Sequence, residues 1–248
     1  MCTTPESKQL SFVCINCNSP ASSLYQKYSK NVIRITECEK CGEIVDKYIE
    51  YDVVLVIMDL ILQYICAYRH LLINTNFQAN LRLAVIYLFC GAYNNWIERR
   101  AIQGGSAAHI YDLEWKFYEC LLLTLIEFIV YITTITAYVF LIDRTTTKDR
   151  LALIAKCSLT GFYGNVFVVL AIIWQLQDDL SYRFLTQLFI LISHVQVHRV
   201  ICDPLLLMYF IFVSALCSRR SAAVTLVLVG FATIMQKAAA YYTNEFVF

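Results

Sequence analysis

A series of apolar segments begins at Val53 and fills most of the remaining chain. The segments are residues 53–73, 81–97, 120–142, 151–174, 184–216 and 222–242. Most approach the roughly 20 residues that a helix needs to cross a bilayer, although 81–97 is short and 184–216 is too long for one straight span. Of all residues, 59% are apolar and 16% are charged, whereas soluble domains average about half and about a quarter. The sequence therefore predicts an all-α polytopic membrane protein, with a multi-span helical region over residues 81–242.

The N-terminal part differs, because it is polar and carries four paired cysteines. The pairs are Cys14-x2-Cys17 and Cys38-x2-Cys41, with twenty residues between them. Each C-x2-C turn presents two thiolates, and two such turns complete the closed tetrahedral shell of a structural zinc site. Gly42 follows the second pair, where such a turn often needs a residue that adopts positive φ. Two disulfides or four unrelated buried thiols are the alternative, but the spacing favours Zn²⁺ held in a structural role, since a closed shell leaves no position for water.

The predicted zinc module, residues 1–52, is electrically balanced. Residues 1–50 hold six Lys or Arg and six Asp or Glu, which is not the clustered positive charge that phosphate binding needs. We therefore expect no nucleic-acid partner. Residues 32–36 are β-branched and suit one short strand, and residues 43–51 could supply another. So short a module has too little core to fold without its metal, which predicts a small zinc ribbon.

The N-terminus indicates where this module lies. Residues 1–11 are polar and lack the apolar core of a signal peptide. We therefore expect the module in the cytosol, where thiols stay reduced and available to metal. The cysteines outside the two pairs, apart from Cys2, are scattered singly through apolar stretches and read as small hydrophobic residues.

Residues 53–74 are predicted to form one amphipathic or membrane helix with a polar stripe. Asp52, Asp59, Gln63 and His70 are separated by 7, 4 and 7 residues, which places them within roughly 20° of one line on a continuous helix. The helix could lie in the membrane interface with the stripe toward water, or span the bilayer with the stripe against other helices. In either placement the stripe is a candidate contact surface for lipid or for a partner.

Residues 14–74 resemble the homology domain of the Arv family of endoplasmic-reticulum lipid-homeostasis proteins. The resemblance is carried by Cys14-x2-Cys17, Leu24-Tyr25-x2-Tyr28, Ile33-Arg34-Ile35-Thr36, Cys38-x2-Cys41, Val45-Asp46-Lys47-Tyr48-Ile49-Glu50-Tyr51-Asp52, Asp59-Leu60-Ile61-Leu62 and Ala67-Tyr68-Arg69-His70-Leu71-Leu72. It covers about a quarter of the chain. The helical remainder matches the family in character only.

The resemblance implies a membrane protein of the endoplasmic reticulum that supports sterol transport, lipid homeostasis and glycosylphosphatidylinositol anchor synthesis, as a lipid transporter or as an accessory factor. It implies sterols and anchor precursors as lipid partners, other membrane proteins of that compartment as further partners, and no catalytic residue. In the family, the zinc module and the following helix are the shared functional unit. A zinc-ribbon scaffold that recruits a partner to the membrane is a second non-catalytic alternative.

A membrane enzyme that acts on lipids is the remaining alternative. His198-x4-Asp203 matches the short pattern of glycerolipid acyltransferases, in which the histidine is a general base oriented by the aspartate. With this chain's histidines and aspartates, such a pair arises by chance with a probability of about one in seven. His194 and His198 are spaced so that they share a helix face and could bind a metal. We expect instead that these residues, with Arg199, form a polar cluster inside the bundle or at a break in segment 184–216.

Overall fold

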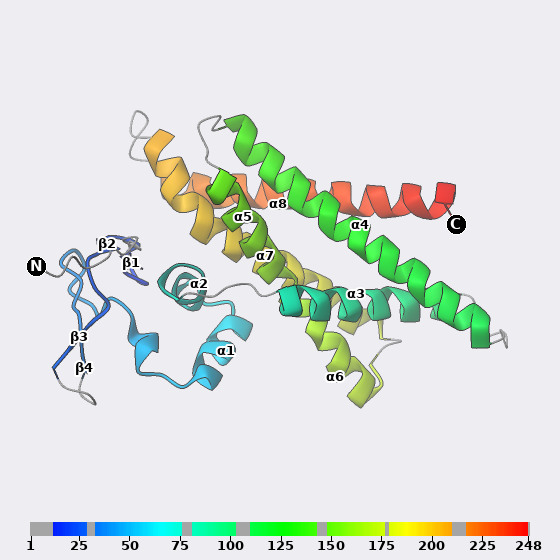
Figure 1. The fold of residues 1–248 in the computed structure, drawn as a ribbon, viewed down its shortest axis with the longest axis horizontal. Coiled ribbons are helices and arrows are strands. Elements are labelled where there is room, and N and C mark those ends of the chain that lie inside the picture. The colour runs from blue at the N-terminus through cyan, green and yellow to red at the C-terminus, as the bar shows by residue number, and fades with distance from the viewer. Residues whose placement is uncertain are drawn as a thin grey trace, which may run out of the picture. The chain divides into compact units, whose positions relative to one another are not determined.

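The computed structural model describes residues 12–28, 33–75, 81–102, 110–142, 148–176, 179–209 and 217–247. The chain divides into two compact units, Met1–Phe77 and Gln78–Phe248. Short strands and short helices make up the described part of the first unit, and long helices make up that of the second (Figure 1). This confirms the predicted fold class, a predominantly helical chain with a small N-terminal module of short strands.

Short antiparallel ladders flank both cysteine pairs in the first unit. Strand β1 (Phe12–Val13) pairs with β2 (Pro20–Ala21), and the first cysteine pair lies in the loop between them. Strand β3 (Tyr25–Lys27) pairs with β4 (Ile33–Ile35). A single bridge joins Glu37 to Ile44 and encloses the second pair in the same way. Each C-x2-C turn is therefore held at the end of a ladder.

The two strands expected in this module have different outcomes. Residues 32–36 contain β4, as predicted. Residues 43–51 do not form a strand, because after the bridge at Ile44 the chain enters a 3-10 helix, Lys47–Ile49. The Asp46 side chain accepts a hydrogen bond from the Tyr48 backbone N–H and so caps this turn. Side chains of this kind compete with strand pairing by bonding to the nearby backbone.

The single helix expected over residues 53–74 is divided into three pieces. Helix α1 (Val53–Ile61), helix α2 (Ile65–Arg69) and a π-helical turn (His70–Asn74) follow one another. Gln63 has a φ of 61°, and the N–H groups of Gln63 and Tyr64 bond to the carbonyls of Leu60 and Asp59. This is a Schellman motif, which ends a helix through one left-handed residue. The predicted continuous helix is therefore wrong.

The second unit is built from six helices over its described residues (Figure 1). They are α3 (Leu81–Ile102), α4 (Ile110–Ile142), α5 (Lys148–Thr160), α6 (Phe167–Trp174), α7 (Leu180–Tyr209) and α8 (Cys217–Val247), with a 3-10 segment, Gly161–Val166, between α5 and α6. Helix α4 packs against α3, α5 and α8 and is the central element of the bundle.

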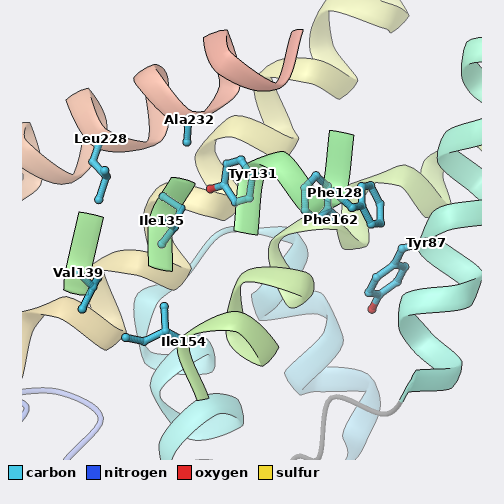
Figure 2. Close-up of a cluster of buried hydrophobic side chains, with 9 residues drawn as sticks. All are labelled: Tyr87, Phe128, Tyr131, Ile135, Val139, Ile154, Phe162, Leu228 and Ala232. Atoms are coloured by element: carbon cyan, nitrogen blue, oxygen red, sulfur yellow. The ribbon is translucent and has the colours of Figure 1, made fainter. Parts of the chain in front are cut away.

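One face of α4 carries the core of the second unit. Phe128, Tyr131, Ile135 and Val139 recur at the three- and four-residue intervals that line one side of a helix. Figure 2 shows them facing the other core residues of the cluster, which are Tyr87 from α3, Ile154 from α5, Phe162 from the 3-10 segment, and Leu228 and Ala232 from α8. The bundle is thus organised around α4.

Two stretches of the described chain have the length and apolarity of membrane spans. They are Glu114–Leu141, with a mean hydropathy of 2.0, and Leu151–Trp174, with a mean hydropathy of 1.7. Both coincide with segments that the sequence predicts to span. They support the assignment of the chain as a membrane protein.

Segment 184–216 was expected to contain a break, and the structure describes it as far as residue 209. Helix α7 runs without a break from Leu180 to Tyr209, through Pro204, so the break expected in the segment does not occur there. Residues 210–216 lie outside the described residues.

Candidate metal centre and the network around it

The structure brings the four predicted cysteines together. Their sulfur atoms all lie within 4.8 Å of one another, with Sγ–Sγ distances of 3.7 Å from Cys14 to Cys41 and 3.6 Å from Cys17 to Cys38. Four thiolates around one ion at a Zn–S distance of about 2.3 Å would be about 3.8 Å apart. A disulfide would hold two sulfurs at about 2.05 Å. The residues therefore fit a tetrahedral metal ion and not two disulfides.

The two cysteine turns have the same backbone geometry. In the first, Asn18 N–H bonds to the Cys14 carbonyl and Cys14 N–H bonds to the Ser19 carbonyl, both at 2.9 Å. In the second, Gly42 N–H bonds to the Cys38 carbonyl at 2.9 Å and Cys38 N–H to the Glu43 carbonyl at 2.8 Å. The residue after each pair has positive φ, 59° at Asn18 and 73° at Gly42. The expectation for Gly42 is confirmed, and Asn18, which sequence reasoning missed, is its counterpart.

The positive φ of Gly42 predicts how substitutions at this position affect metal binding by the second turn. A side chain built there would meet no atom within 4 Å, so Gly42→Ala is penalised only by the left-handed conformation, at about 1 kcal/mol. We expect the Ala variant to bind the metal about fivefold more weakly in competition with a chelator. Gly42→Asn is the matched control and should lose less, because asparagine tolerates this conformation and already occupies it at position 18. Equal losses in both variants would contradict the explanation.

The environments of the cysteines differ, and Ser19 is the main reason. Its hydroxyl lies 2.9 Å from Cys17 Sγ and 3.2 Å from Cys38 Sγ. This hydroxyl, followed by the backbone N–H groups of Cys41 and Lys40, lowers the pKa of Cys38 to about 6, and it also lowers the pKa of Cys17. Burial raises the pKa of Cys14 to about 12. Because a metal ligand must be the thiolate, metal binding at neutral pH should release the Cys14 proton.

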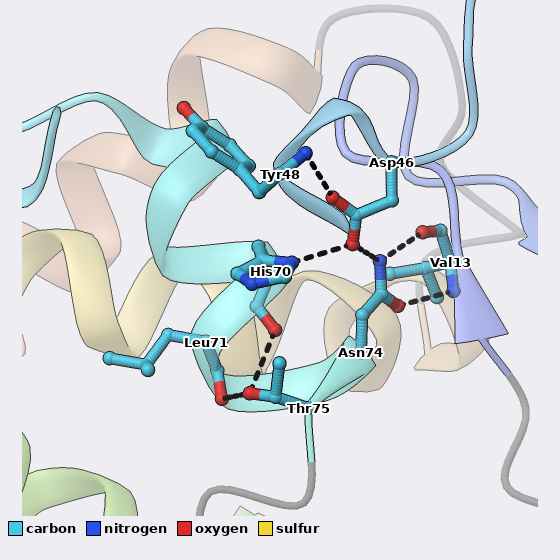
Figure 3. Close-up of polar contacts among 7 residues, drawn as sticks. All are labelled: Val13, Asp46, Tyr48, His70, Leu71, Asn74 and Thr75. Atoms are coloured by element: carbon cyan, nitrogen blue, oxygen red, sulfur yellow. Dashed lines mark hydrogen bonds and ion pairs between the residues drawn. The ribbon is translucent and has the colours of Figure 1, made fainter. Parts of the chain in front are cut away.

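A buried carboxylate joins the 3-10 turn to the π-helical turn and, through Asn74, to β1. Asp46 is fully buried and accepts hydrogen bonds from Tyr48 N–H at 3.0 Å, His70 Nδ1 at 2.8 Å and Asn74 Nδ2 at 2.7 Å (Figure 3). Asn74 in turn donates to the Val13 carbonyl at 2.9 Å and accepts from Val13 N–H at 3.0 Å. The end of the helical segment is thereby joined to β1.

Arg69 is hydrogen-bonded to the backbone of the first cysteine turn. Its Nη1 donates to the carbonyls of Ile15 and Asn16 at 2.7 and 2.9 Å, and its side chain is largely buried. From the sequence, Asp46 and Arg69 are recognisable only as part of the family resemblance, with no role assigned to them, and Asn74 is not singled out. The available signal was the presence of ionisable and amide residues at the end of a strongly apolar stretch.

The four residues of the predicted polar stripe do not share one face, because the helix ends between them. Asp59 accepts a hydrogen bond from the Tyr48 hydroxyl at 2.7 Å, and Gln63 accepts one from Tyr68 at 2.7 Å. His70 bonds to Asp46, and Asp52 is the exposed N-cap residue of α1. Burial, and then the adjacent Asp59, raises the pKa of Tyr48, so its phenol remains a donor. Contact of this set with lipid or a partner stays a prediction.

Of the polar cluster predicted on α7, the structure shows the two histidines buried together. His194 and His198 are 1% and 0% exposed, their rings lie 6.4 Å apart, and His198 Nε2 lies 3.1 Å from the Tyr131 hydroxyl. The side chain of Asp203 lies outside the described part of the structure, so the His198–Asp203 pattern stays a hypothesis. Among the residues described, only the four cysteines form a group of three or more ligand side chains close enough to share a metal ion.

The model of the Arv1-like family matches residues 13–197. The chain is 32% identical to human Protein ARV1 over 203 residues, which cover 79% of this chain and 74% of the relative. It is 28% identical to the Dictyostelium discoideum Protein arv1 homolog over 210 residues, which cover 77% and 85%. It is 32% identical to Saccharomyces cerevisiae Protein ARV1 over 152 residues, which cover 58% and 45%. No solved structure matches the chain.

The extent of these matches changes one expectation. The resemblance seen in the sequence covers residues 14–74. For the remainder it extends only to the hydrophobic, multi-span nature of the chain, without residue-by-residue correspondence. The family model instead continues through α3, α4 and α5 into α7. The family model therefore covers the cysteine module and the helical region up to residue 197 as one continuous stretch.

Proposed function

This chain belongs to the Arv1-like family, and from that premise we propose that it is a membrane protein of the endoplasmic reticulum that supports sterol transport and glycosylphosphatidylinositol anchor synthesis. The observation that carries the proposal is the family match, which spans both the cysteine module and most of the helical bundle. The two candidate membrane spans support a membrane location. The role is non-catalytic, either the movement of lipid or assistance to other machinery.

The ion in the proposed metal centre is Zn²⁺, held by Cys14, Cys17, Cys38 and Cys41. Four thiolates at tetrahedral spacing suit zinc, and a closed set of four protein ligands is typical of structural sites. The ion would supply a cross-link between the two cysteine turns, which are far apart in the chain. The module lies on the cytosolic side in this proposal, where thiols remain reduced.

Helix α1 supports a second element of the proposal, the attachment of the first unit to the membrane surface. Its exposed side chains are almost all apolar: Val53, Val54, Leu55, Ile57, Met58 and Ile61, continued by Leu62 and Tyr64 after the helix. Asp59 is turned inward to Tyr48. Apolar residues scattered singly are common on soluble surfaces, but a contiguous set on one short helix marks an interaction surface. A unit joined to a membrane-spanning region has a bilayer within reach, so α1 lies in the interface.

Fluorescence quenching can locate α1 relative to lipid. With Trp96, Trp115 and Trp174 replaced by phenylalanine, a single tryptophan at Val54 (Val54→Trp) should be quenched strongly by brominated lipids in reconstituted protein. The matched control is a single tryptophan at Lys27 (Lys27→Trp), an exposed position on β3, which should be quenched weakly. If quenching at Val54→Trp were as weak as at Lys27→Trp, α1 would lie outside the bilayer. A protein partner on its apolar side would then be favoured.

The proposed function is tested in cells from which the protein has been removed. Restoring the chain should restore sterol distribution and the delivery of glycosylphosphatidylinositol-anchored proteins, whereas a normally abundant variant without its metal centre should not. Purified protein in liposomes then separates the two roles, by scoring lipid movement and product formation independently. Normal sterol and anchor levels in the depleted cells would refute the proposal, and formation of a new lipid product would favour the enzyme.

A further inference from the structure

The helical bundle of the second unit contains a cavity of about 610 Å³. Its walls come from α3, α4, the 3-10 segment Gly161–Val166, α7 and α8. Cavities that bind small molecules have volumes of about 300–1,000 Å³, and a few placed polar groups in their walls fix the ligand. The size suits a small molecule or the head group of a lipid, and the polar side chains that line the cavity restrict its chemistry.

One of these side chains is a buried carboxylate whose counter-ion is largely exposed. Glu127 Oε1 on α4 lies 3.3 Å from Lys237 Nζ on α8, and the two side chains are 8% and 57% exposed. Ionisable groups inside a membrane bundle are costly and usually mark a functional site. An ion pair with an exposed member is weak, because water competes for the charged group. A ligand cation can therefore take the place of Lys237 beside Glu127.

A buried amide next to this carboxylate has its oxygen atom left over. Gln236 is 8% exposed and bonds to Glu127 Oε2 at 3.3 Å. A carboxylate only accepts, so the bonded atom of Gln236 is Nε2 and the amide orientation is fixed. Its Oε1 accepts no hydrogen bond from the described residues, and it is not among the atoms closed off from solvent. An amide oxygen that lacks a partner at such a depth indicates a missing donor.

Two asparagines that line the cavity are oriented in the same way. The Thr124 hydroxyl donates to the Cys120 carbonyl at 2.8 Å, so its oxygen accepts from Asn95 Nδ2 at 3.0 Å. Asn165 Nδ2 donates to the Tyr87 carbonyl at 3.4 Å. Within the described part of the chain, the oxygen of each asparagine has no partner, and neither oxygen is closed off. Three amide oxygens therefore line the cavity together with the carboxylate.

These acceptors select a ligand that donates hydrogen bonds and carries a positive charge. A primary ammonium has three N–H donors and no acceptor. Its bonds to a carboxylate are charge-assisted and about twice as strong as those between neutral groups. A hydroxyl offers one donor and no charge, so it would leave the carboxylate uncompensated once Lys237 is displaced. The ligand group beside Glu127 is thus best satisfied as an ammonium.

The charge balance of the cavity indicates that the ligand is neutral overall. Among the described residues that line it, Glu127 and Lys237 are the only acidic and basic side chains apart from one histidine. When an ammonium pairs with Glu127, Lys237 is left for an anionic group of the same ligand. Exposed Gln187 and the second N–H of each amide are further donors for that group. A zwitterion meets both charges, whereas a simple amine meets one.

We propose that this cavity binds a zwitterionic ligand, with a primary ammonium on Glu127 and an adjacent anionic group on Lys237. The lipid phosphatidylethanolamine and its soluble head group, phosphoethanolamine, share this chemistry. The inference goes beyond the proposed function and rests on it for the membrane location of the bundle, from which a lipid would reach the cavity. It assigns a ligand site to the second unit, separate from the cysteine cluster of the first.

Native mass spectrometry of the purified full chain in detergent micelles tests the ammonium contact. The probes are phosphatidylethanolamine, its N,N-dimethyl derivative and phosphatidylcholine, which have the same acyl chains and carry three, one and no N–H donors. Binding should weaken along this series, with phosphatidylcholine about tenfold weaker than phosphatidylethanolamine.

A second arm distinguishes the two sources of this head group. Soluble phosphoethanolamine is added to the same protein, with phosphocholine as the matched control. A graded lipid series assigns phosphatidylethanolamine as the ligand, whereas binding of phosphoethanolamine over phosphocholine without a graded lipid series assigns the soluble compound. If neither arm distinguishes the primary ammonium from the quaternary one, the proposal is overturned.

Two pairs of variants connect this preference to the cavity. Glu127→Gln keeps the size of the side chain and removes its charge, so the tenfold preference should disappear. Glu114→Gln, at an exposed position of α4 that does not line the cavity, should retain it. Gln187→Trp adds bulk at the cavity wall and should reduce binding, whereas Leu185→Trp, exposed on the same helix α7 and outside the cavity lining, should not.

An undiminished preference in a folded Glu127→Gln or Gln187→Trp protein would overturn the proposal. If Glu127→Gln does not fold, Gln187→Trp still decides the outcome, because its position is exposed. A failure of the site is distinguishable from a failure of the proposed function. Ammonium-selective binding together with normal sterol and anchor levels in depleted cells would refute only the function. Altered levels in those cells without selective binding would refute only the site.

Discussion

Replacement of Cys38 by serine is expected to abolish metal binding and to unfold the first unit. The four sulfurs form one cluster, and metal binding contributes about 10–16 kcal/mol to the folding of comparable small zinc modules. The cores of this unit are small, and Cys14 and Cys38 themselves belong to one of them. Elemental analysis should show about one zinc per chain in the unaltered protein and close to none in the variant. Hydrogen exchange over residues 12–75 should increase in the variant.

Cys66→Ser is the matched control for this experiment. Cys66 lies in the same unit, on α2, but its thiol donates to Asn16 Oδ1 at 3.8 Å and is not part of the cluster. We expect this variant to keep its zinc and its exchange protection. A Cys38→Ser protein that retains full zinc, or unaltered protein that contains none after careful handling, would contradict the assignment of the metal centre.

Replacement of Asp46 by alanine is expected to destabilise the first unit by about 3–5 kcal/mol, the cost of removing one partner from a buried charged network. Three donors, from Tyr48, His70 and Asn74, would lose their acceptor in a region that water does not reach. Hydrogen exchange of residues 65–75 should rise strongly while the four thiols remain in place. Zinc should be released at lower chelator concentration, because the network supports the first cysteine turn.

Glu50→Ala provides the comparison, since it removes a carboxylate that is exposed and only four residues away. Surface substitutions of this kind usually change stability by less than about 0.5 kcal/mol. If Asp46→Ala behaved like Glu50→Ala, the network would have no structural importance, and the buried contacts of His70 and Asn74 would need another explanation.

The network also changes the interpretation of the segment after the cysteine module. Asp59 and His70 were predicted to face lipid or a partner, yet each is hydrogen-bonded to the module itself. The apolar residues of α1 are the ones left exposed. The segment therefore combines two roles in our proposal, since its polar side chains hold the cysteine module together and its apolar side chains meet the membrane.

The cluster of four cysteines was predictable because its geometry is local. A C-x2-C turn places two sulfurs by its own backbone conformation, and the positive φ of Gly42 belongs to the same turn. Apolar segments likewise predicted the helical region, since span length and composition depend only on neighbouring residues. Ser19 and Asn18 could have been found in the same way, as they stand directly after the first pair.

Contacts between distant residues were decided only by the tertiary structure. Asp46 meets His70 and Asn74, 24 and 28 residues later, and Asn74 meets Val13 across 61 residues. The polar stripe was wrong for a related reason, because helical periodicity assumes an unbroken helix, whereas α1 ends before Gln63, which has a positive φ. The cavity of the second unit is lined by residues of five segments, α3, α4, the 3-10 segment Gly161–Val166, α7 and α8. The spacing of two residues in the sequence predicts their relative positions only where the backbone between them forms regular secondary structure. Elsewhere their positions depend on the tertiary fold.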